Sequence, residues 1–265
     1  MTEYIDQRSS GEPSQDTWQR WLRRYDGQQQ LYIEARERRF DVMFSLLEDL
    51  LPAEITVLDL MAGPGAVSER LLSRMPVACS VAVDVDPVLL RLGRNALGDG
   101  GGRLRWVRAD VIEPAWVDEL GQDRFDAVLS CTALHWLPAP DMARVYQQLA
   151  QLLAPGGVLI SGDLLPLPAH LRRIRAAVRS VDRRRQKKAA DNGAQTWDQW
   201  WDALRGEPSL RAEFAERDRR WPPGSVSGRE APGQAFHEAA LVEAGFADVA
   251  VIWQDLEERL LLALR

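Results

Sequence analysis

The chain is poor in cysteine and histidine, and each scarcity excludes a class of site. Only two cysteines occur among 265 residues, which excludes a disulfide framework and a cysteine-rich zinc site. The three histidines, His135, His170 and His237, are too far apart to place an HxxxH pair on one helix face. We therefore expect no metal centre.

Long apolar runs and an excess of positive charge are also missing. The longest apolar stretch, residues 152–167, is broken by Pro155, Gly156 and Asp163 and falls short of the roughly 18 residues that a membrane helix needs. The net charge of −6 lacks the positive field of a nucleic-acid binder. The polar N-terminus MTEYIDQRSS has no signal or transit peptide. We expect a cytoplasmic protein, with neither a membrane nor a nucleic acid as its partner.

What remains is a globular composition, with 46% hydrophobic and 27% charged residues, at a length suited to one large domain or two small ones. We expect a disordered N-terminus over residues 1–14, followed by two helices within residues 15–50. The first covers Thr17–Tyr25 and is interrupted at Gly27, and the second runs from Gln28 to Leu50.

From residue 51 onward, apolar runs alternate with helical patterns. Ile55–Leu60 is a continuous apolar run, typical of a strand buried on both faces of a parallel sheet. The further strands are expected at residues 80–84, 104–108, 125–130, 157–162, 248–253 and 259–264. Strands that alternate with helices indicate βαβ units. We predict an α/β fold: a doubly wound, Rossmann-like sheet of seven strands, mostly parallel, with the last strand antiparallel.

The alternation stops after Asp163. Residues 165–221 have helical patterns with the breaker Asn192-Gly193 among them, and a loop continues to Pro232. We assign residues 51–164 and 233–265 to one core domain. Residues 165–232 are a helical insertion, which we expect to cap the substrate.

A glycine turn, Ala62-Gly63-Pro64-Gly65, follows the first strand. Such a turn lets the backbone approach a nucleotide at the carboxyl end of a sheet, although it also occurs where nothing binds. Asp84 ends the next strand, where a carboxylate is placed to bond both hydroxyls of a ribose. A nicotinamide dehydrogenase is disfavoured, because Ser68 takes the place of the third fingerprint glycine and Asp59 would repel a pyrophosphate.

Successive segments resemble the motifs of class I S-adenosylmethionine-dependent methyltransferases, in the family's order and spacing. They are VLDLMAGPG (57–65), VAVDVDP (81–87), VRADV (107–111), FDAVLSCTALHWL (125–137) and LLAPGGVLISGD (152–163). HEAALVEAGFADVAVIWQD (237–255) resembles the family's last helix and sixth strand. The resemblance implies S-adenosylmethionine as the methyl donor and S-adenosylhomocysteine as the product.

The resemblance also implies roles for individual residues toward this cofactor. They are Asp59, Met61, Ala62, Gly63 and Gly65 along the methionine chain, Asp84 at the ribose hydroxyls, Val85, Asp110 and Val111 around the adenine, and Ser130 near the sulfonium. Arg36, on the second helix, is a candidate partner of the cofactor carboxylate, with a solvated charged face as the alternative. Met61 departs from the family, which has a glycine there, and Asp86 competes with Asp84 for the ribose.

The residues expected on the acceptor side follow the fourth strand or lie on helices outside the core. His135, at the carboxyl edge of the sheet, is the candidate general base, with a structural role as an equally weighted alternative. The candidate substrate-binding residues are Tyr32, Trp136, Trp197, Trp200 and Trp201. The three tryptophans of the insertion share one helix face, which suits core packing or an apolar wall over a flat acceptor.

We predict methyl transfer to a small apolar or aromatic molecule by in-line displacement, as in biosynthetic enzymes. The stretch Arg172–Lys188, with nine basic residues and only Asp182 acidic, favours RNA or protein methylation as an alternative. Met61 in place of a glycine leaves a third possibility, a scaffold that binds the cofactor without catalysis.

Overall fold

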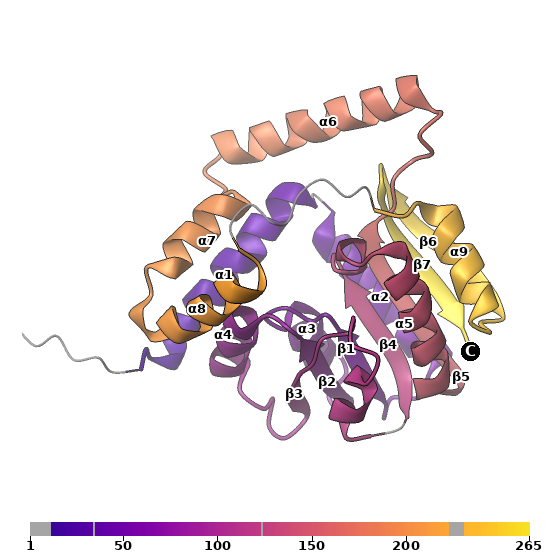
Figure 1. Cartoon of the computed structure of the whole chain (residues 1–265), viewed down its shortest axis with the longest axis horizontal. Coiled ribbons are helices and arrows are strands. Elements are labelled where there is room, and N and C mark those ends of the chain that lie inside the picture. The colour runs from indigo at the N-terminus through magenta and orange to yellow at the C-terminus, as the bar shows by residue number, and fades with distance from the viewer. Residues whose placement is uncertain (1–11, 34, 123, 223–230) are drawn as a thin grey trace, which may run out of the picture.

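The computed structural model describes residues 12–33, 35–122, 124–222 and 231–265. Its strands are β1 (Thr56–Leu60), β2 (Cys79–Asp84), β3 (Leu104–Arg108), β4 (Phe125–Cys131), β5 (Leu153–Leu164), β6 (Asp248–Asp255) and β7 (Glu258–Leu264). They form one seven-stranded sheet in the order β3-β2-β1-β4-β5-β7-β6 (Figure 1). Strand β7 runs antiparallel to both of its neighbours, and the other strands run in one direction. The predicted fold class is confirmed.

The order of the strands reverses next to β1. The chain first moves outward from β1 to β2 and β3, and it then crosses back to place β4 on the other side of β1. The connections leave β1 and β4 in opposite directions, so a crevice opens at their carboxyl ends. The loops that follow β1, β2, β4 and β5 all meet at this edge of the sheet.

Helices cover both faces of the sheet (Figure 1). They are α1 (Gln15–Tyr32), α2 (Arg36–Leu50), α3 (Ala66–Arg74), α4 (Pro87–Leu97), α5 (Ala139–Leu152), α6 (Arg172–Asp191), α7 (Trp197–Arg205), α8 (Arg211–Arg220) and α9 (Gln234–Glu243), with the short 3-10 turns η1 (Trp116–Leu120), η2 (Leu134–Trp136) and η3 (Pro208–Leu210). Helices α5 and α9 bury Tyr146 and Leu241 on one face, and α2 and α3 bury Met43 and Leu71 on the other.

The two N-terminal helices have other bounds than the sequence indicated. Helix α1 continues through Gly27 to Tyr32, and α2 begins only at Arg36, so the expected interruption at Gly27 and the helix start at Gln28 are wrong. Gly27 is exposed, and nothing lies within 4 Å of the position that a Cβ would take. A glycine there costs the helix about 1 kcal/mol, which burial of Trp18 and Leu31 outweighs. The disorder expected over residues 1–14 falls mostly outside the described residues.

The strands of the C-terminal half are longer than expected. Strand β5 covers Leu153–Leu164 rather than residues 157–162, because its first residues follow α5 without a connecting loop. Strands β6 and β7 form the antiparallel pair that the sequence indicated. Helix α6 ends at Asp191, immediately before the breaker Asn192-Gly193.

Two helices of the insertion pack on the N-terminal helix rather than on the sheet. Helices α7 and α8 share a buried apolar cluster with α1 and α4, and Trp18, Leu92, Trp200, Trp201 and Phe214 are among its members. Trp200 is fully buried, and its ring lies edge-on to Trp201 with centroids 5.0 Å apart. This cluster holds the insertion against the α4 side of the core.

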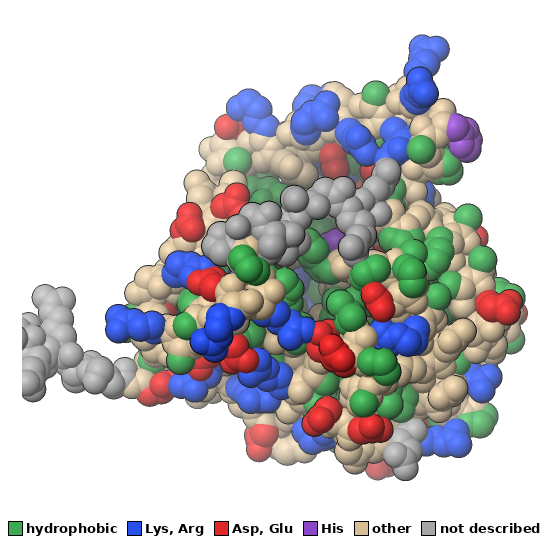
Figure 2. All heavy atoms as spheres, viewed as in Figure 1, with side chains coloured by type: hydrophobic (Ala, Val, Ile, Leu, Met, Phe, Trp, Pro, Cys, Tyr) green, Lys and Arg blue, Asp and Glu red, His purple; other side chains and the backbone are tan. Residues whose placement is uncertain are grey.

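The basic stretch of the sequence forms most of α6, which spans from α7 toward the β6–β7 edge (Figure 1). None of its residues is buried, and Figure 2 shows Lys and Arg side chains gathered along this part of the surface. Arg185 forms an ion pair with Asp255 of β6 at 2.8 Å. Within the described ranges, no helix is both long and apolar enough to cross a membrane.

Replacing Trp200 should weaken the fold much more than replacing an exposed tryptophan. We expect Trp200→Ala to lower the free energy of unfolding by about 3–5 kcal/mol, because it leaves a cavity in the cluster. Trp136 is 54% exposed, and Trp136→Ala should change stability by less than about 0.5 kcal/mol. Chemical denaturation followed by circular dichroism measures both. Equal losses in the two variants would contradict the packing of α7.

Candidate functional site

The glycine loop between β1 and α3 is built on left-handed backbone. Met61, Gly63 and Gly65 all have positive φ, at 56°, 56° and 89°. The loop is tied to the second strand, since the Gly63 N–H donates to Asp84 Oδ2 at 2.7 Å and the Ala62 N–H donates to the Val83 carbonyl at 2.9 Å. The turn therefore holds its backbone close to the end of β2.

The two glycines of the loop share a positive φ but have different surroundings. A Cβ on Gly65 would lie 2.5 Å from the ring of Trp106, so this glycine permits close packing of the loop on β3. A Cβ on Gly63 would lie 3.5 Å from the Tyr25 hydroxyl oxygen, so Gly63 lies beneath α1. Met61 occupies a conformation that costs a residue with a side chain about 1–2 kcal/mol. A glycine, the family residue at this position, would be free of that strain.

Asp59 is a buried carboxylate, and only one of its two oxygens accepts hydrogen bonds from the described residues. Its Oδ2 accepts hydrogen bonds from the Ser68 amide at 3.0 Å and from the Ser68 hydroxyl at 2.6 Å. Its Oδ1 is buried and has no partner among the described residues. Burial raises the pKa of Asp59 to about 7, against the opposing hydrogen bonds from Ser68. An orphaned acceptor of this kind is a place where a cationic donor would be stabilised.

Asp84 and Asp86 serve different purposes at the end of β2. Asp84 accepts from the amides of Gly63 and Asp86, and burial raises its pKa to about 6. Asp86 caps α4 by accepting from the amides of Val88 and Leu89, and its second oxygen forms an ion pair with Arg217 of α8 at 2.7 Å. Both oxygens of Asp86 are thus engaged in holding helices.

The residues after β3 are also tied to α8. Asp110 accepts from the Ile112 amide through one oxygen, and its other oxygen pairs with Arg220. Arg108, on β3, pairs with Glu216 of the same helix. Val111 is buried in the core. Helix α8 therefore lies over the ends of β2 and β3 and contacts both of them through charged pairs.

Ser130 lies at the junction of β4 and β1. It is buried, and its hydroxyl donates to the Leu60 carbonyl at 2.9 Å. This bond joins β4 to the residue that precedes Met61. The side chain therefore supports the start of the glycine loop, and only its lone pairs remain free for another donor.

His135 and Asp163 form a pair where β4 and β5 end. The Nδ1 atom of His135 lies 2.6 Å from Asp163 Oδ1. Asp163 Oδ2 accepts from the amides of Ala133 and His135, at 3.2 and 3.1 Å. Burial lowers the pKa of His135, but the negative charge and hydrogen bond of Asp163 outweigh it, so the pKa lies above its ordinary value. Asp163 is fully buried, whereas 19% of the His135 side chain remains exposed.

A buried arginine supports the same loop from the opposite side. Arg39 of α2 donates to Glu258 Oε2 at 2.7 Å and to the Thr132 hydroxyl at 2.8 Å. Thr132 has a φ of 55°, a strained value for a β-branched residue. Burial raises the pKa of Glu258 to about 7, although the charge of Arg39 opposes it. The backbone between β4 and His135 is thus fixed from two strands and one helix.

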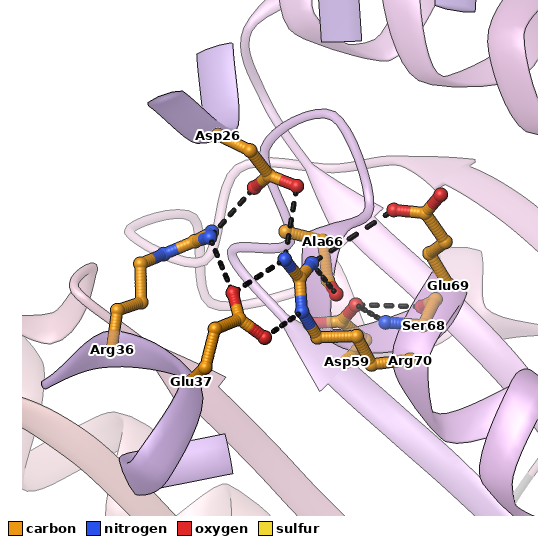
Figure 3. Close-up of polar contacts among 8 residues, drawn as sticks. All are labelled: Asp26, Arg36, Glu37, Asp59, Ala66, Ser68, Glu69 and Arg70. Carbon is orange, nitrogen blue, oxygen red and sulfur yellow. Dashed lines mark hydrogen bonds and ion pairs between the residues drawn. The ribbon is translucent and has the colours of Figure 1, made fainter. Parts of the chain in front are cut away.

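Arg36 belongs to a network that joins three helices, drawn in Figure 3. It pairs with Asp26 of α1 at 2.7 Å, and Arg70 of α3 pairs with Asp26 at 3.0 Å and with Glu37 at 2.7 Å. Only 4% of Arg36 is exposed, which excludes the solvated charged face considered above. Arg70 also donates to the Ala66 carbonyl in the first turn of α3. The network fixes the corner between α1 and α2 beside the glycine loop.

The structure separates the predicted acceptor residues into two groups. Trp136 is exposed, and its ring centroid lies 4.9 Å from that of His135. Trp200 and Trp201 are core residues of the α7 cluster, and Trp197 is packed against that cluster. The Tyr32 hydroxyl accepts from the Trp197 amide at 3.0 Å, which joins α1 to α7. Of this set, Trp136 alone accompanies His135.

Three residues at the site were not singled out from the sequence. Asp163 is the last residue of the fifth motif. Its position at the end of a strand, next to the strand that His135 follows, could have indicated it as the partner of the histidine. Arg39 lies within a charged run that hides its burial. Tyr25 lies on α1, and its pKa is raised by burial. No described residue forms a hydrogen bond with its hydroxyl, which faces the glycine loop. Among the described residues, no cluster of His, Cys, Asp and Glu is arranged to hold a metal ion.

Comparison with known proteins shows a similarity to methyltransferases over part of the chain. Residues 57–157 match a family model described as a methyltransferase domain. A trans-aconitate 2-methyltransferase from Azoarcus sp. is 33% identical over 136 residues, which cover 51% of this chain and 49% of that protein. A malonyl-[acyl-carrier protein] O-methyltransferase from Halorhodospira halophila is 31% identical over 157 residues, covering 56% and 49%. The chain therefore spans about half the length of the curated relatives it matches.

A solved structure of an O-methyltransferase family protein from Burkholderia thailandensis shares the fold. It aligns with a TM-score of 0.53 at 19% sequence identity, covering 87% of this chain and 59% of that one. The matched domain, the ordered motifs at the strand ends and the sheet order agree with one another. Over residues 57–157 the chain is thus similar to methyltransferase domains, and its sheet has the fold of that solved structure.

Proposed function

We propose that this protein transfers a methyl group from S-adenosylmethionine to an oxygen or nitrogen of a small molecule, with His135 as the general base. The observation that carries the proposal is the pair of His135 and Asp163. It lies at the same edge of the sheet as the glycine loop, Asp59 and Asp84. The candidate base and the glycine loop, which is of the kind that binds nucleotides, thus lie at the same crevice.

The residues of the loop suit the cofactor. The unpartnered Oδ1 of Asp59 is the acceptor that an ammonium group requires, and the methionine part of the cofactor carries one. Arg36 is the nearby buried cation for its carboxylate, and the Tyr25 hydroxyl is a donor over Gly63. When bound, S-adenosylmethionine supplies an electrophilic methyl group on a sulfonium. Met61 packs against the core and leaves these groups in place, which disfavours the scaffold interpretation.

The nucleoside side of the site depends on Asp84. Its carboxylate bridges Gly63 and Asp86 at the end of β2, the position from which this fold binds a ribose. We assign Val85, Asp110 and Val111 to the adenine, as the family resemblance implies. Ser130 supports the loop from β4, and Ala62 and Gly65 contribute backbone only. We assign the ribose to Asp84 rather than Asp86, because Asp86 caps α4 and forms an ion pair with Arg217, whereas Asp84 accepts only backbone amides.

His135 is arranged to take a proton from the acceptor. Asp163 accepts a hydrogen bond from Nδ1, which selects the tautomer whose Nε2 carries the lone pair. With S-adenosylmethionine as methyl donor and S-adenosylhomocysteine as leaving group, Nε2 would take the proton of the acceptor hydroxyl, and Asp163 would stabilise the resulting imidazolium. The bonds from Asp163 to the Ala133 and His135 amides hold the ring in position. Alignment supplies the rest of the rate, because methyl displacement requires an in-line geometry.

The chemical class of the acceptor is supported by two observations. The relative from Halorhodospira halophila is named an O-methyltransferase, which favours oxygen as the methylated atom. Trp136 presents an exposed indole beside His135, which favours an apolar or aromatic body. We therefore propose a small apolar or aromatic oxygen acceptor.

Removing the charge of Asp84 should weaken cofactor binding, and removing that of Asp86 should not. Charge-assisted hydrogen bonds contribute roughly 1.5–3 kcal/mol each, so Asp84→Asn should weaken the affinity for S-adenosylhomocysteine at least about tenfold. Asp86→Asn is the matched control, because asparagine also caps helices. Calorimetry measures both affinities, and thermal unfolding checks the fold. Equal losses in the two variants would refute the assignment.

Neutralising Asp59 should stabilise the cofactor-free protein in a pH-dependent way. Its folded pKa of about 7 is above that of the unfolded chain, so the wild type loses stability as the pH rises toward 7. Asp59→Asn should match the wild type below about pH 4 and be more stable than it above about pH 7. The same variant should bind S-adenosylhomocysteine more weakly at pH 8. Denaturation curves across this range test the first part, and a constant difference in stability would contradict it.

Replacing His135 should slow turnover without affecting cofactor binding. We expect His135→Gln to lower kcat about 10²–10⁴-fold on a hydroxyl acceptor, with the affinity for S-adenosylhomocysteine nearly unchanged. In the wild type, kcat should fall on the acidic side with a midpoint above the ordinary pKa of about 6.5, because Asp163 favours the protonated ring. Asp163→Asn should move that midpoint down.

The exposed His170 supplies the control, since His170→Gln should have wild-type turnover. A His135→Gln variant that keeps wild-type kcat on the acceptor would remove the histidine from the mechanism.

A further inference from the structure

A groove lies beside the candidate site, between the segment that follows β5 and the start of α9. Its volume is about 670 Å³. The residues that line it are Pro166, Leu167, Pro168, Ala169, Ala231, Gly233, Gln234, Ala235, Phe236, Glu238 and Arg259. Most of these side chains are apolar, and only Arg259 is cationic. The groove is therefore suited to an apolar body with an anionic end.

Arg259 is a buried cation with a free donor. Only 4% of the residue is exposed, yet it forms no ion pair with another described residue. One guanidinium nitrogen donates to the Leu165 carbonyl, whereas Nε is buried and lacks a partner within the described ranges. A buried arginine keeps its charge, and the Arg259 side chain lines the groove, so its positive charge would stabilise an anion bound there.

Two carboxylates lie near this arginine but are bound elsewhere. Glu238 accepts from the Gln234 side chain at 2.7 Å, and Glu257 accepts from the Leu167 amide at 2.7 Å. Burial lowers the pKa of Arg259, and the charges of these two glutamates oppose that effect. They help to keep Arg259 protonated without occupying its Nε.

The first turn of α9 adds a second set of donors. Gly233 is the N-cap residue, and no side chain caps the helix. Gln234 and Ala235, whose amides belong to that open turn, line the groove. The first amides of a helix and the positive end of its dipole attract anions. Arg259 and the start of α9 thus face the same space.

The groove is adjacent to His135 through the sheet. Arg259 on β7 lies opposite Asp163 on β5 in the antiparallel register. Residues opposite each other in such a pair project from the same face of the sheet. Asp163 accepts a hydrogen bond from His135. The Asp163 side chain, which positions the base, and the Arg259 side chain, which lines the groove, are therefore neighbours on one face of the sheet.

We infer that the groove binds the carboxylate of an organic acid, with Arg259 and the first turn of α9 as its partners and Leu167 and Phe236 against its apolar body. The inference rests on the proposed function and defines its acceptor further: a carboxylic acid whose methylated hydroxyl lies at another point of the molecule, near His135. The carboxylate serves as an anchor and is not itself the methyl acceptor.

Calorimetry with a small panel of acids tests the inference. The probes are phenylacetate, 3-phenylpropionate, 4-phenylbutyrate and hexanoate, each compared with its primary amide, in a buffer free of carboxylates. We expect at least one acid to bind at least about tenfold more tightly than its amide, with an affinity that falls as salt rises. Equal binding of every acid and its amide, or no binding at all, would overturn the inference.

Three variants locate the site. Arg259→Met should abolish the preference for the acid. Ala235→Asp should weaken acid binding at least about tenfold, and it covers the case in which Arg259→Met fails to fold, because an acidic residue suits the first turn of a helix. Ala239→Asp is the matched control on the same helix, and it should bind like the wild type. Retention of the acid preference in both Arg259→Met and Ala235→Asp would overturn the inference.

The titrations are run with and without S-adenosylhomocysteine. Failure of that compound to bind would count against the proposed function. The titrations of the acids and amides against the protein alone would still show whether the groove binds a carboxylate.

Discussion

A carboxylate buried at the end of a strand must find hydrogen-bond donors, because burial without them costs several kcal/mol. Asp59, Asp84 and Asp163 lie at or next to the ends of β1, β2 and β5, and each accepts hydrogen bonds mainly from the chain that follows a strand. Only Oδ1 of Asp59 is left without a partner among the described residues. Asp84 draws the glycine loop onto β2, and Asp163 draws the loop after β4 onto β5. The shape of the crevice thus follows from where these negative charges are buried.

The sheet was predictable because its central strands are short apolar runs that alternate with helical patterns, and this alternation is typical of a parallel α/β sheet. The helix bounds near Gly27 could not be predicted. Glycine has a low helix propensity, but the packing of residues on either side of Gly27 keeps the chain helical there. The insertion was visible as an interruption of the strand–helix alternation. Its docking on α1 and α4 was not visible, because an apolar helix face does not specify which surface it covers.

The place of a residue at a strand end could be predicted from the sequence, whereas its contacts could not. Asp84 ends β2 as the apolar run before it indicated, but the capping of α4 by Asp86 and its ion pair with Arg217 are visible only in the structure. The partner of His135 was beyond the sequence, because Asp163 lies 28 residues away and only strand pairing brings them together. The tryptophans of α7 have the same spacing whether they form a wall or a core, so only the structure placed Trp200 in the core.

Helix α8 gives the insertion one further property. Arg217 and Arg220 reach from one helix to Asp86 after β2 and to Asp110 after β3, and Arg108 reaches back from β3 to Glu216. Most of these side chains are partly open to solvent, so dissolved ions screen their attraction while leaving the apolar cluster behind them intact. The attraction between α8 and the ends of β2 and β3 therefore weakens as ionic strength rises, whereas the burial of Phe214 in the apolar cluster does not depend on salt in this way.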